Sequence, residues 1–231
     1  MSTIITGEYL LPGEFPRKTE EEHFERYKFA AQYVKRKNIL DIACGVGYGC
    51  KIYSESGANT IVGIDVLPDN IAHAKSNYLA DNISFIQNNL YDINYTEEFD
   101  IISSFETIEH VDNDSLALAK MHRALKADGL LIISTPNRKI TSPNSKSIND
   151  KPLNEYHVRE YTLAEFKHLL TSNGFRILKV LGQRNRIFFP FYICNRIVNK
   201  FYKPDTNGNS KPKKNILTQA RYYTLVLEKI V

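Results

Sequence analysis

The sequence predicts one α/β domain in which helices cover both faces of a mostly parallel sheet. Short apolar runs alternate with helical segments between residues 38 and 134, and this alternation is typical of parallel sheets. Glycines at positions 45, 47 and 49 follow the first apolar run. The chain has 231 residues, 42% of them hydrophobic, which is enough for one core and too little for two ordinary domains.

The elements before the glycine turn are an arm, a helix and a strand. Residues 1–20 contain scattered glycine and proline, so we expect an irregular arm. A helix begins at Thr19, because three glutamates follow it and favour the positive end of a helix dipole. It leads into the first strand, residues 38–43.

The central elements follow in alternation. We expect strands at 60–65, 83–87, 99–104 and 129–134, with helices at 69–78 and 115–125. Residues 138–155 are rich in Ser, Asn, Lys and Pro, and so long a loop in a compact domain is usually functional or disordered. We therefore expect a lid over 138–160.

The C-terminal third contains a helix, two β-rich runs and an insertion. Thr162 caps a helix that ends near Gly174, and the β-rich runs are 175–181 and 222–231. Residues 183–220 between them mix aromatic and basic side chains, which suits a cap, a homodimer face or an interfacial helix. We favour a cap or a dimer face. The basic residues form either a solvated surface or a surface that meets phosphates.

The glycine turn and the carboxylate after the second strand predict a cradle for a ligand that contains a ribose. Glycines allow a tight turn and close approach of the backbone, and Asp65 can accept both ribose hydroxyls. Two residues depart from the dinucleotide fingerprint. Cys50 replaces a small residue, and Asp41 would repel a pyrophosphate but can receive an ammonium through ordered water or backbone. The ligand is therefore expected to be cationic.

Four motifs extend this prediction: D-I-A-C-G-V-G-Y-G at 41–49, G-I-D at 63–65, E-H-V at 109–111 and L-K-A-D-G at 125–129. In this order and spacing they resemble the class I S-adenosylmethionine (SAM) dependent methyltransferases, from about residue 22 to residue 182. The resemblance implies a Rossmann-like sheet of seven strands with an antiparallel last strand. It also implies SAM as cofactor and S-adenosylhomocysteine (SAH) as product.

The predicted cofactor residues come from the ends of the first four strands. Asn89 falls where the family usually has an aspartate that accepts from the adenine amino group, and Leu90 would give an apolar face to the ring. The full set of predicted cofactor residues is Asp41, Gly45, Gly47, Gly49, Asp65, Val66, Asn89, Leu90 and Ser104.

Two histidines are the predicted catalytic residues. A hydroxyl acceptor needs a base with a pKa near neutrality, most often a histidine, whereas an amine acceptor needs only to be held unprotonated. His110 follows the fourth strand, and His157 lies between the lid and a helix. Either histidine could instead orient its loop. We expect Glu106, Tyr156 and Arg159 to contact the acceptor, and no metal site, because histidines and cysteines lack metal-ligand spacing.

The acceptor is the least constrained part of the prediction. The segments 7–14, 23–27 and 156–161 resemble bacterial methyltransferases of polysaccharide and sugar-nucleotide pathways. This resemblance implies a sugar, nucleotide sugar or glycan. A quinone or another small aromatic metabolite is the alternative acceptor, and a SAM-binding or nucleic-acid-binding interaction protein is the alternative outside enzymes. We expect no nucleic-acid partner, because the sequence carries no known binding signature.

Composition predicts the compartment. The net charge is +4 and there are three cysteines, an odd number that argues for a reducing interior. The N-terminus lacks a basic and then apolar leader, and no run approaches the roughly 20 apolar residues of a membrane span. We therefore expect a cytoplasmic protein.

Overall fold

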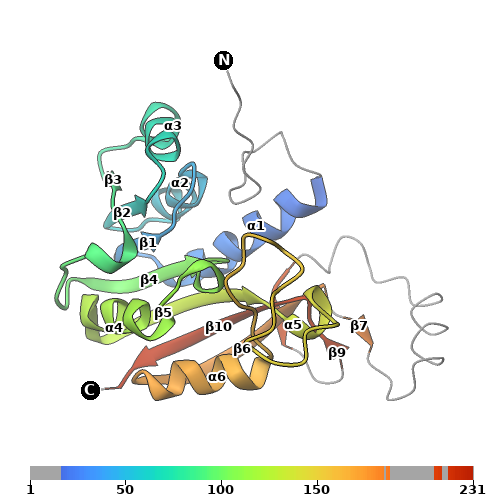
Figure 1. The fold of residues 1–231 in the computed structure, drawn as a ribbon. Coiled ribbons are helices and arrows are strands. Elements are labelled where there is room, and N and C mark those ends of the chain that lie inside the picture. Colours follow the sequence, from blue (N-terminus) through green and yellow to red (C-terminus); the bar gives the residue numbers. More distant parts are fainter. Residues whose placement is uncertain (1–16, 185, 188–210, 215–217, 231) are drawn as a thin grey trace.

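The computed structural model describes residues 17–184, 186–187, 211–214 and 218–230 (Figure 1). The arm up to residue 16 and most of the predicted insertion lie outside these residues. The strands are β1 (Asn38–Ile42), β2 (Thr60–Asp65), β3 (Ile83–Gln87), β4 (Phe99–Phe105), β5 (Leu125–Pro136), β6 (Phe175–Gln183), β7 (Arg186–Ile187), β8 (Lys213–Lys214), β9 (Thr218–Gln219) and β10 (Tyr222–Lys229). The helices are α1 (Arg17–Ala30), α2 (Tyr48–Glu55), α3 (Pro68–Tyr78), α4 (Asp114–Ala124), α5 (Arg138–Thr141) and α6 (Leu163–Ser172), with 3-10 turns η1 (Ala31–Tyr33), η2 (Leu90–Asp92) and η3 (Ile108–His110).

The main sheet confirms the predicted fold class. Its strand order is β3-β2-β1-β4-β5-β10-β6, and the two-residue β8 lies beside β6. Strands β1 to β5 pair in parallel, whereas β10 pairs antiparallel with both β5 and β6. The chain first runs outward from β1 through β2 to β3. It then returns to β4, on the other side of β1. Parallel α/β sheets bind ligands at such a reversal point.

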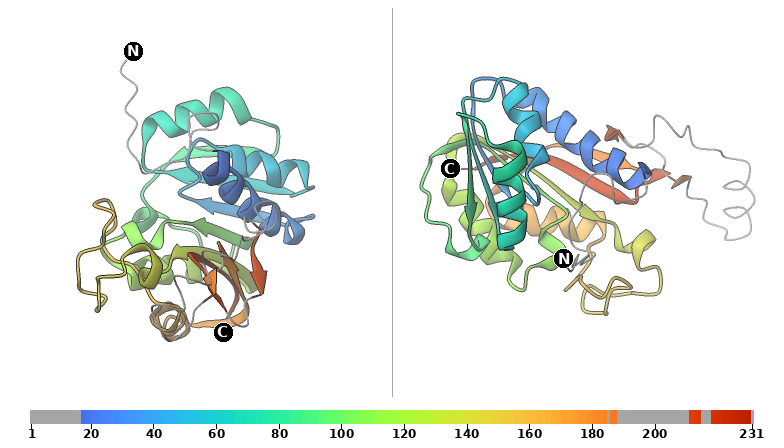
Figure 2. Two further views of the ribbon diagram at one scale, coloured as in Figure 1. Left: turned by 90° about the vertical axis from the view of Figure 1, so that its right-hand side faces the viewer. Right: turned by 90° about the horizontal axis from the view of Figure 1, so that it is seen from above.

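Helices cover both faces of the sheet (Figure 2). Alternating side chains along each strand build a separate core on each face. Ile39 of β1 packs with α1, α2 and α3, whereas Leu40 packs with α4 and α6. Both residues are fully buried. Because both faces are covered, the strands are apolar on both sides, as in other parallel sheets.

Most element ends lie within two residues of their predicted positions, and α6 has the predicted cap. Thr162 and Glu165 form a capping box, in which each side chain accepts a hydrogen bond from the other residue's backbone N–H. One boundary was predicted wrongly. The strand predicted from residue 129 begins at Leu125, which is buried and pairs with Phe99 in the sheet.

The predicted lid is attached at both ends to the rest of the domain. At its start, Arg138 of α5 is buried and donates to Glu165 Oε1 of α6 at 2.7 Å. Within the segment, Leu153 N donates to Ser142 Oγ at 2.8 Å. Nearer its end, Val158 N donates to the Glu109 carbonyl at 2.9 Å. The segment therefore rests on η3, and its opening stays a prediction. Among the described residues, none of the helices is long and apolar enough to cross a membrane.

Candidate active site

A cavity of about 360 Å³ opens at the carboxyl ends of β1, β2 and β4. Its walls come from α1, the glycine turn and the loops after these strands. The described lining residues are His23, Tyr27, Ile42, Ala43, Cys44, Gly45, Tyr48, Ile64, Asp65, Val66, Leu67, Asn70, Asn88, Asn89, Leu90, Tyr91, Phe105, Glu106, Thr107, His110, Val111 and Asp112. The volume and the strand ends match a small-molecule site at a reversal point.

The three glycines of the turn have different roles. A Cβ on Gly45, where φ is +55°, would meet no described atom within 4 Å, so this position lies open beside the cavity that it lines. A Cβ on Gly47 would come within 2.7 Å of Ala74 Cβ. A Cβ on Gly49 would come within 2.0 Å of the Tyr27 ring. Among the described lining residues, Gly45 is therefore the glycine that lies beside the cavity. Gly47 and Gly49 allow α2 to pack closely against Ala74 and Tyr27.

Asp65 links the end of β2 to the glycine turn. Its Oδ2 accepts from Gly45 N at 2.9 Å, and its Oδ1 accepts from Leu67 N at 2.9 Å and Asn70 Nδ2 at 3.1 Å. Oδ2 keeps a further lone pair, so a ribose hydroxyl can still be accepted there. Asn70 is a lining residue that sequence reasoning missed. It stands one helical turn into α3 and carries no signal of its own.

Asp41 lies behind the cavity wall. Its carboxylate is fully buried and accepts from Ser103 Oγ at 2.5 Å and Tyr27 OH at 3.1 Å. Burial raises the pKa of Asp41 to about 7, although the hydrogen bonds from Ser103 and Tyr27 oppose this shift. Asp41 is not among the described lining residues, so contact with an ammonium would have to be indirect.

The predicted adenine end lies between the loops after β2 and β3. Val66, Asn89 and Leu90 all line the cavity there. Asn89 Oδ1 already accepts from Tyr91 N at 2.9 Å, which caps η2. Its amide keeps a second lone pair and two donors for a base edge. Ser104, by contrast, is buried near the end of β4, outside the described lining, and its Oγ has no partner among the described residues.

Glu106 lines the cavity directly after β4. Its Oε1 accepts from Ser134 Oγ at 2.6 Å and lies 4.0 Å from the guanidinium of Arg26, which is 1% exposed. The positive φ of Glu106, +51°, turns the chain sharply after β4. His23 of α1 also lines the cavity, although the sequence had not pointed to it. Burial, with Arg26 and Arg184 nearby, lowers the pKa of His23, so it is neutral at pH 7.

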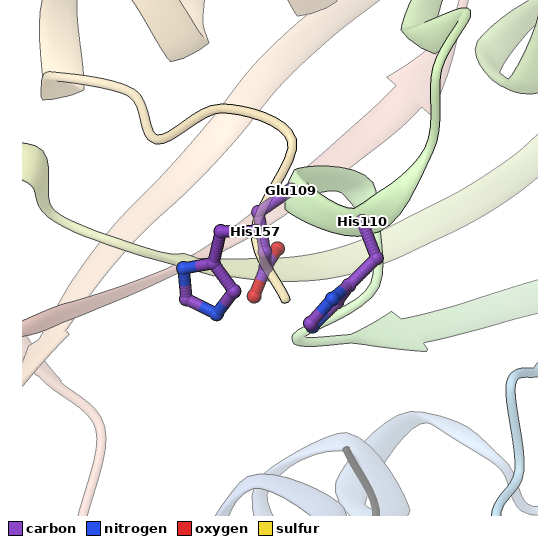
Figure 3. Close-up of side chains that lie close together, drawn as sticks. All are labelled: Glu109, His110 and His157. Carbon is purple, nitrogen blue, oxygen red and sulfur yellow. The ribbon is translucent and has the colours of Figure 1, made fainter. Parts of the chain in front are cut away.

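His110 and His157 lie together, with Glu109 between them (Figure 3). Their ring centroids are 4.8 Å apart and the rings are nearly perpendicular. His110 lines the cavity, and its Nδ1 lies 3.0 Å from the Tyr156 carbonyl. His157 lies behind it, with Nδ1 2.7 Å from Glu160 Oε1 and Nε2 2.8 Å from Asn154 Nδ2. The structure thus brings the two predicted histidines together, but only His110 faces the cavity.

The other two predicted acceptor residues hold the loops in place. Arg159 donates to Asp114 Oδ2 at 2.8 Å and to the Asp112 carbonyl at 2.7 Å. The side chain of Tyr156 is 42% exposed. Neither residue belongs to the described cavity wall. Direct contact with an acceptor stays a prediction for both.

Comparisons with known proteins agree with this geometry. A family model described as a methyltransferase domain matches residues 16–180. A probable S-adenosylmethionine-dependent methyltransferase of Mycolicibacterium smegmatis is 29% identical over 184 residues, which cover 77% of this chain and 67% of the relative. A ubiquinone biosynthesis O-methyltransferase of Glaesserella parasuis is 42% identical over 115 residues, 44% of this chain and 46% of the relative.

Solved structures share the fold. A SAM-dependent methyltransferase from Mesorhizobium loti has a TM-score of 0.63 at 16% identity, covering 90% of this chain and 98% of that one. The present chain spans about two thirds of the length of its mycobacterial relatives. Because the family model covers most of the sequence, this chain belongs to the methyltransferase domain family, and it is a SAM-dependent methyltransferase of class I.

Proposed function

We propose that the protein methylates a hydroxyl group of a small molecule, and that this molecule is a sugar or a nucleotide sugar. The observation that carries the proposal is the polar part of the cavity wall that follows β4, formed by Glu106, Thr107, His110 and Asp112. Such groups suit an acceptor with several hydroxyls, because each hydroxyl that enters a cavity needs a hydrogen-bond partner.

The residues of the chain supply position and proton transfer. Bound SAM supplies an activated methyl group: the acceptor oxygen bonds to the methyl carbon, the carbon–sulfur bond breaks with its electron pair on sulfur, and the hydroxyl proton is released. Gly45, Asp65 and Asn89 line the cavity, and this supports the proposal that they hold the cofactor. Alignment of the reacting atoms accounts for much of the catalysis in such displacements.

His110 is the proposed acceptor of the hydroxyl proton. Its Nδ1 lies 3.0 Å from a carbonyl oxygen, so the proton belongs on Nδ1 and the lone pair on Nε2. That arrangement is the one that a general base needs. His157 positions this ring from behind, at a centroid distance of 4.8 Å.

A dihydroxylated aromatic compound is the second candidate acceptor. The similarity to a ubiquinone biosynthesis O-methyltransferase supports it.

A cytoplasmic location stays a prediction, supported by the free buried thiols of Cys44 and Cys50.

Titration calorimetry with SAH, alone and with nucleotide sugars or catechols, tests the proposal. We expect micromolar SAH binding and tighter binding in the presence of the matching acceptor class. Mass spectrometry of reactions with SAM would then detect a product heavier by one methylene. Absence of SAH binding would refute the proposed function, and a product methylated on nitrogen would refute the hydroxyl acceptor.

The base is tested separately. His110→Asn should lower kcat by about 100-fold, the scale of general base catalysis, and should leave SAH affinity within twofold. His168→Ala on the exposed side of α6 is the matched control and should leave both values unchanged. An unchanged kcat in the His110 variant would contradict the assignment.

A further inference from the structure

Three side chains of types that bind metals lie close together at the part of the cavity wall that contains His110. One ligand atom from each of Glu109, His110 and His157 lies within 4.8 Å of the other two. Glu109 and His110 belong to η3, and His157 belongs to the segment that rests on it (Figure 3). Among the described residues, this group is the one that combines histidine and carboxylate ligands in this way.

The buried carboxylate lacks a partner for one of its oxygens. Glu109 is 0% exposed, and its Oε2 accepts from Thr135 Oγ1 at 3.0 Å. Its Oε1 has no hydrogen-bond partner among the described residues. A buried acceptor without a partner is costly, and a bound cation would satisfy it.

Both histidines are oriented as metal ligands usually are. In metal sites the second ring nitrogen of a ligating histidine typically donates to a carbonyl or a carboxylate. His110 Nδ1 lies 3.0 Å from the Tyr156 carbonyl, and His157 Nδ1 lies 2.7 Å from the buried Glu160 carboxylate. These contacts leave the lone pair of each ring on Nε2. A cation would replace the contact of His157 Nε2 with Asn154 Nδ2.

We propose that Glu109, His110 and His157 bind one divalent transition-metal cation, which in turn binds the acceptor hydroxyl. Two imidazoles with one carboxylate favour the series from Mn²⁺ to Zn²⁺ over Mg²⁺ or Ca²⁺ and leave coordination positions open. The ligand atoms must close from 4.8 Å to about 3 Å around such an ion. This distance is within reach of small side-chain movements in the loop that carries His157.

The inference rests on the proposed function and changes one of its steps. A bound cation lowers the pKa of a coordinated hydroxyl, so the proton passes to bulk water and His110 serves as a ligand and not as the base. The methyl group still moves from sulfur to the acceptor oxygen. Vicinal hydroxyls, as found in sugars and in catechols, could occupy two open positions together.

The test is titration of untagged, chelator-treated protein with Co²⁺, followed by calorimetry and by visible absorption, which reports nitrogen ligands. We expect one equivalent to bind, at least tenfold weaker binding in Glu109→Gln and in His157→Gln, and unchanged binding in His168→Ala. Glu109→Gln keeps the shape of the protonated side chain, so it should fold. Circular dichroism checks this, and His157→Gln, outside the cavity wall, is the second probe.

The outcomes separate this inference from the proposed function. Equal Co²⁺ binding by the wild type and both cluster variants, or none by the wild type, would overturn the metal site. SAH binding and methyl transfer insensitive to EDTA would then keep the proposed function with His110 as base. Loss of methyl transfer on EDTA treatment, with recovery on adding Co²⁺ or Mn²⁺ and unchanged SAH affinity, would support the metal site.

Discussion

The buried carboxylate of Asp41 predicts an unusual dependence of stability on pH. Burial raises its pKa from 3.8 to about 7 in the folded protein. The folded state therefore holds this proton more tightly than the unfolded state does. The stability that comes from this proton is fully present below pH 3.8 and is lost as pH rises to about 7. About 3 pKa units correspond to about 4 kcal/mol of unfolding free energy.

Asp41→Asn removes this proton. The amide oxygen can still accept from Ser103, and the Tyr27 hydroxyl can rotate to accept from the amide nitrogen. We therefore expect a variant that is equal to or slightly less stable than the wild type near pH 4.5. Near pH 8 it should be more stable, by up to about 4 kcal/mol.

Urea unfolding of both proteins at several pH values measures this difference, and subtracting the two curves cancels the contribution of other groups. Asp100→Asn is a control of opposite sign. Burial alone would raise the pKa of Asp100, but hydrogen bonds from Asn38 N and Lys126 outweigh burial and lower it. That variant should be less stable than wild type above about pH 4, and this difference should shrink as pH falls below 3.8. A pH-independent difference between wild type and Asp41→Asn would refute the reasoning.

Three further predictions follow from single contacts. Asp65→Ala should weaken SAH binding more than tenfold in calorimetry, because it removes the ribose acceptor and the hydrogen bond to the glycine turn. Asp69→Ala, on the exposed face of α3, is the control and should leave SAH affinity unchanged. Equal affinities of the two variants would contradict the cradle. Gly49→Ala should destabilise the fold by about 2 kcal/mol or more, because its Cβ would overlap the Tyr27 ring, and an unchanged melting temperature would exclude that overlap. Thr162→Ala should cost about 1 kcal/mol through the lost cap and leave kcat unchanged; a changed kcat would point to a role for the cap in the lid.

Local patterns carried the prediction of the elements and of the cradle. Apolar runs marked β1 to β4 closely, since strands buried on both faces need continuous apolar side chains. The apolar run of β2 also predicted that Asp65 ends this strand, and in the structure Asp65 accepts a hydrogen bond from Gly45 N. The start of β5 could not be read this way, because the sheet partner Phe99, and not the local sequence, decides the conformation of Leu125.

Contacts between distant segments were not predictable from local pattern. The ring of Tyr27 leaves no room for a side chain at position 49, and the Tyr27 hydroxyl donates to Asp41. Both facts depend on how α1 packs across the sheet. Likewise, the sequence predicted that Arg159 contacts the acceptor, whereas in the structure its guanidinium donates a hydrogen bond to Asp114.

The sequence by itself determined the α/β class and SAM as cofactor, and it predicted the cradle and the pair of histidines, because periodicity, glycine chemistry and ordered motifs are local properties of the chain. Only the tertiary structure decided that His110 faces the cavity, that His157 lies behind it, and that Glu109 completes a cluster with both. The reason is physical: η3 and the segment carrying His157 meet through backbone hydrogen bonds from Val158 and Arg159 to the Glu109 carbonyl. Such pairing between segments leaves no periodic trace in either of them.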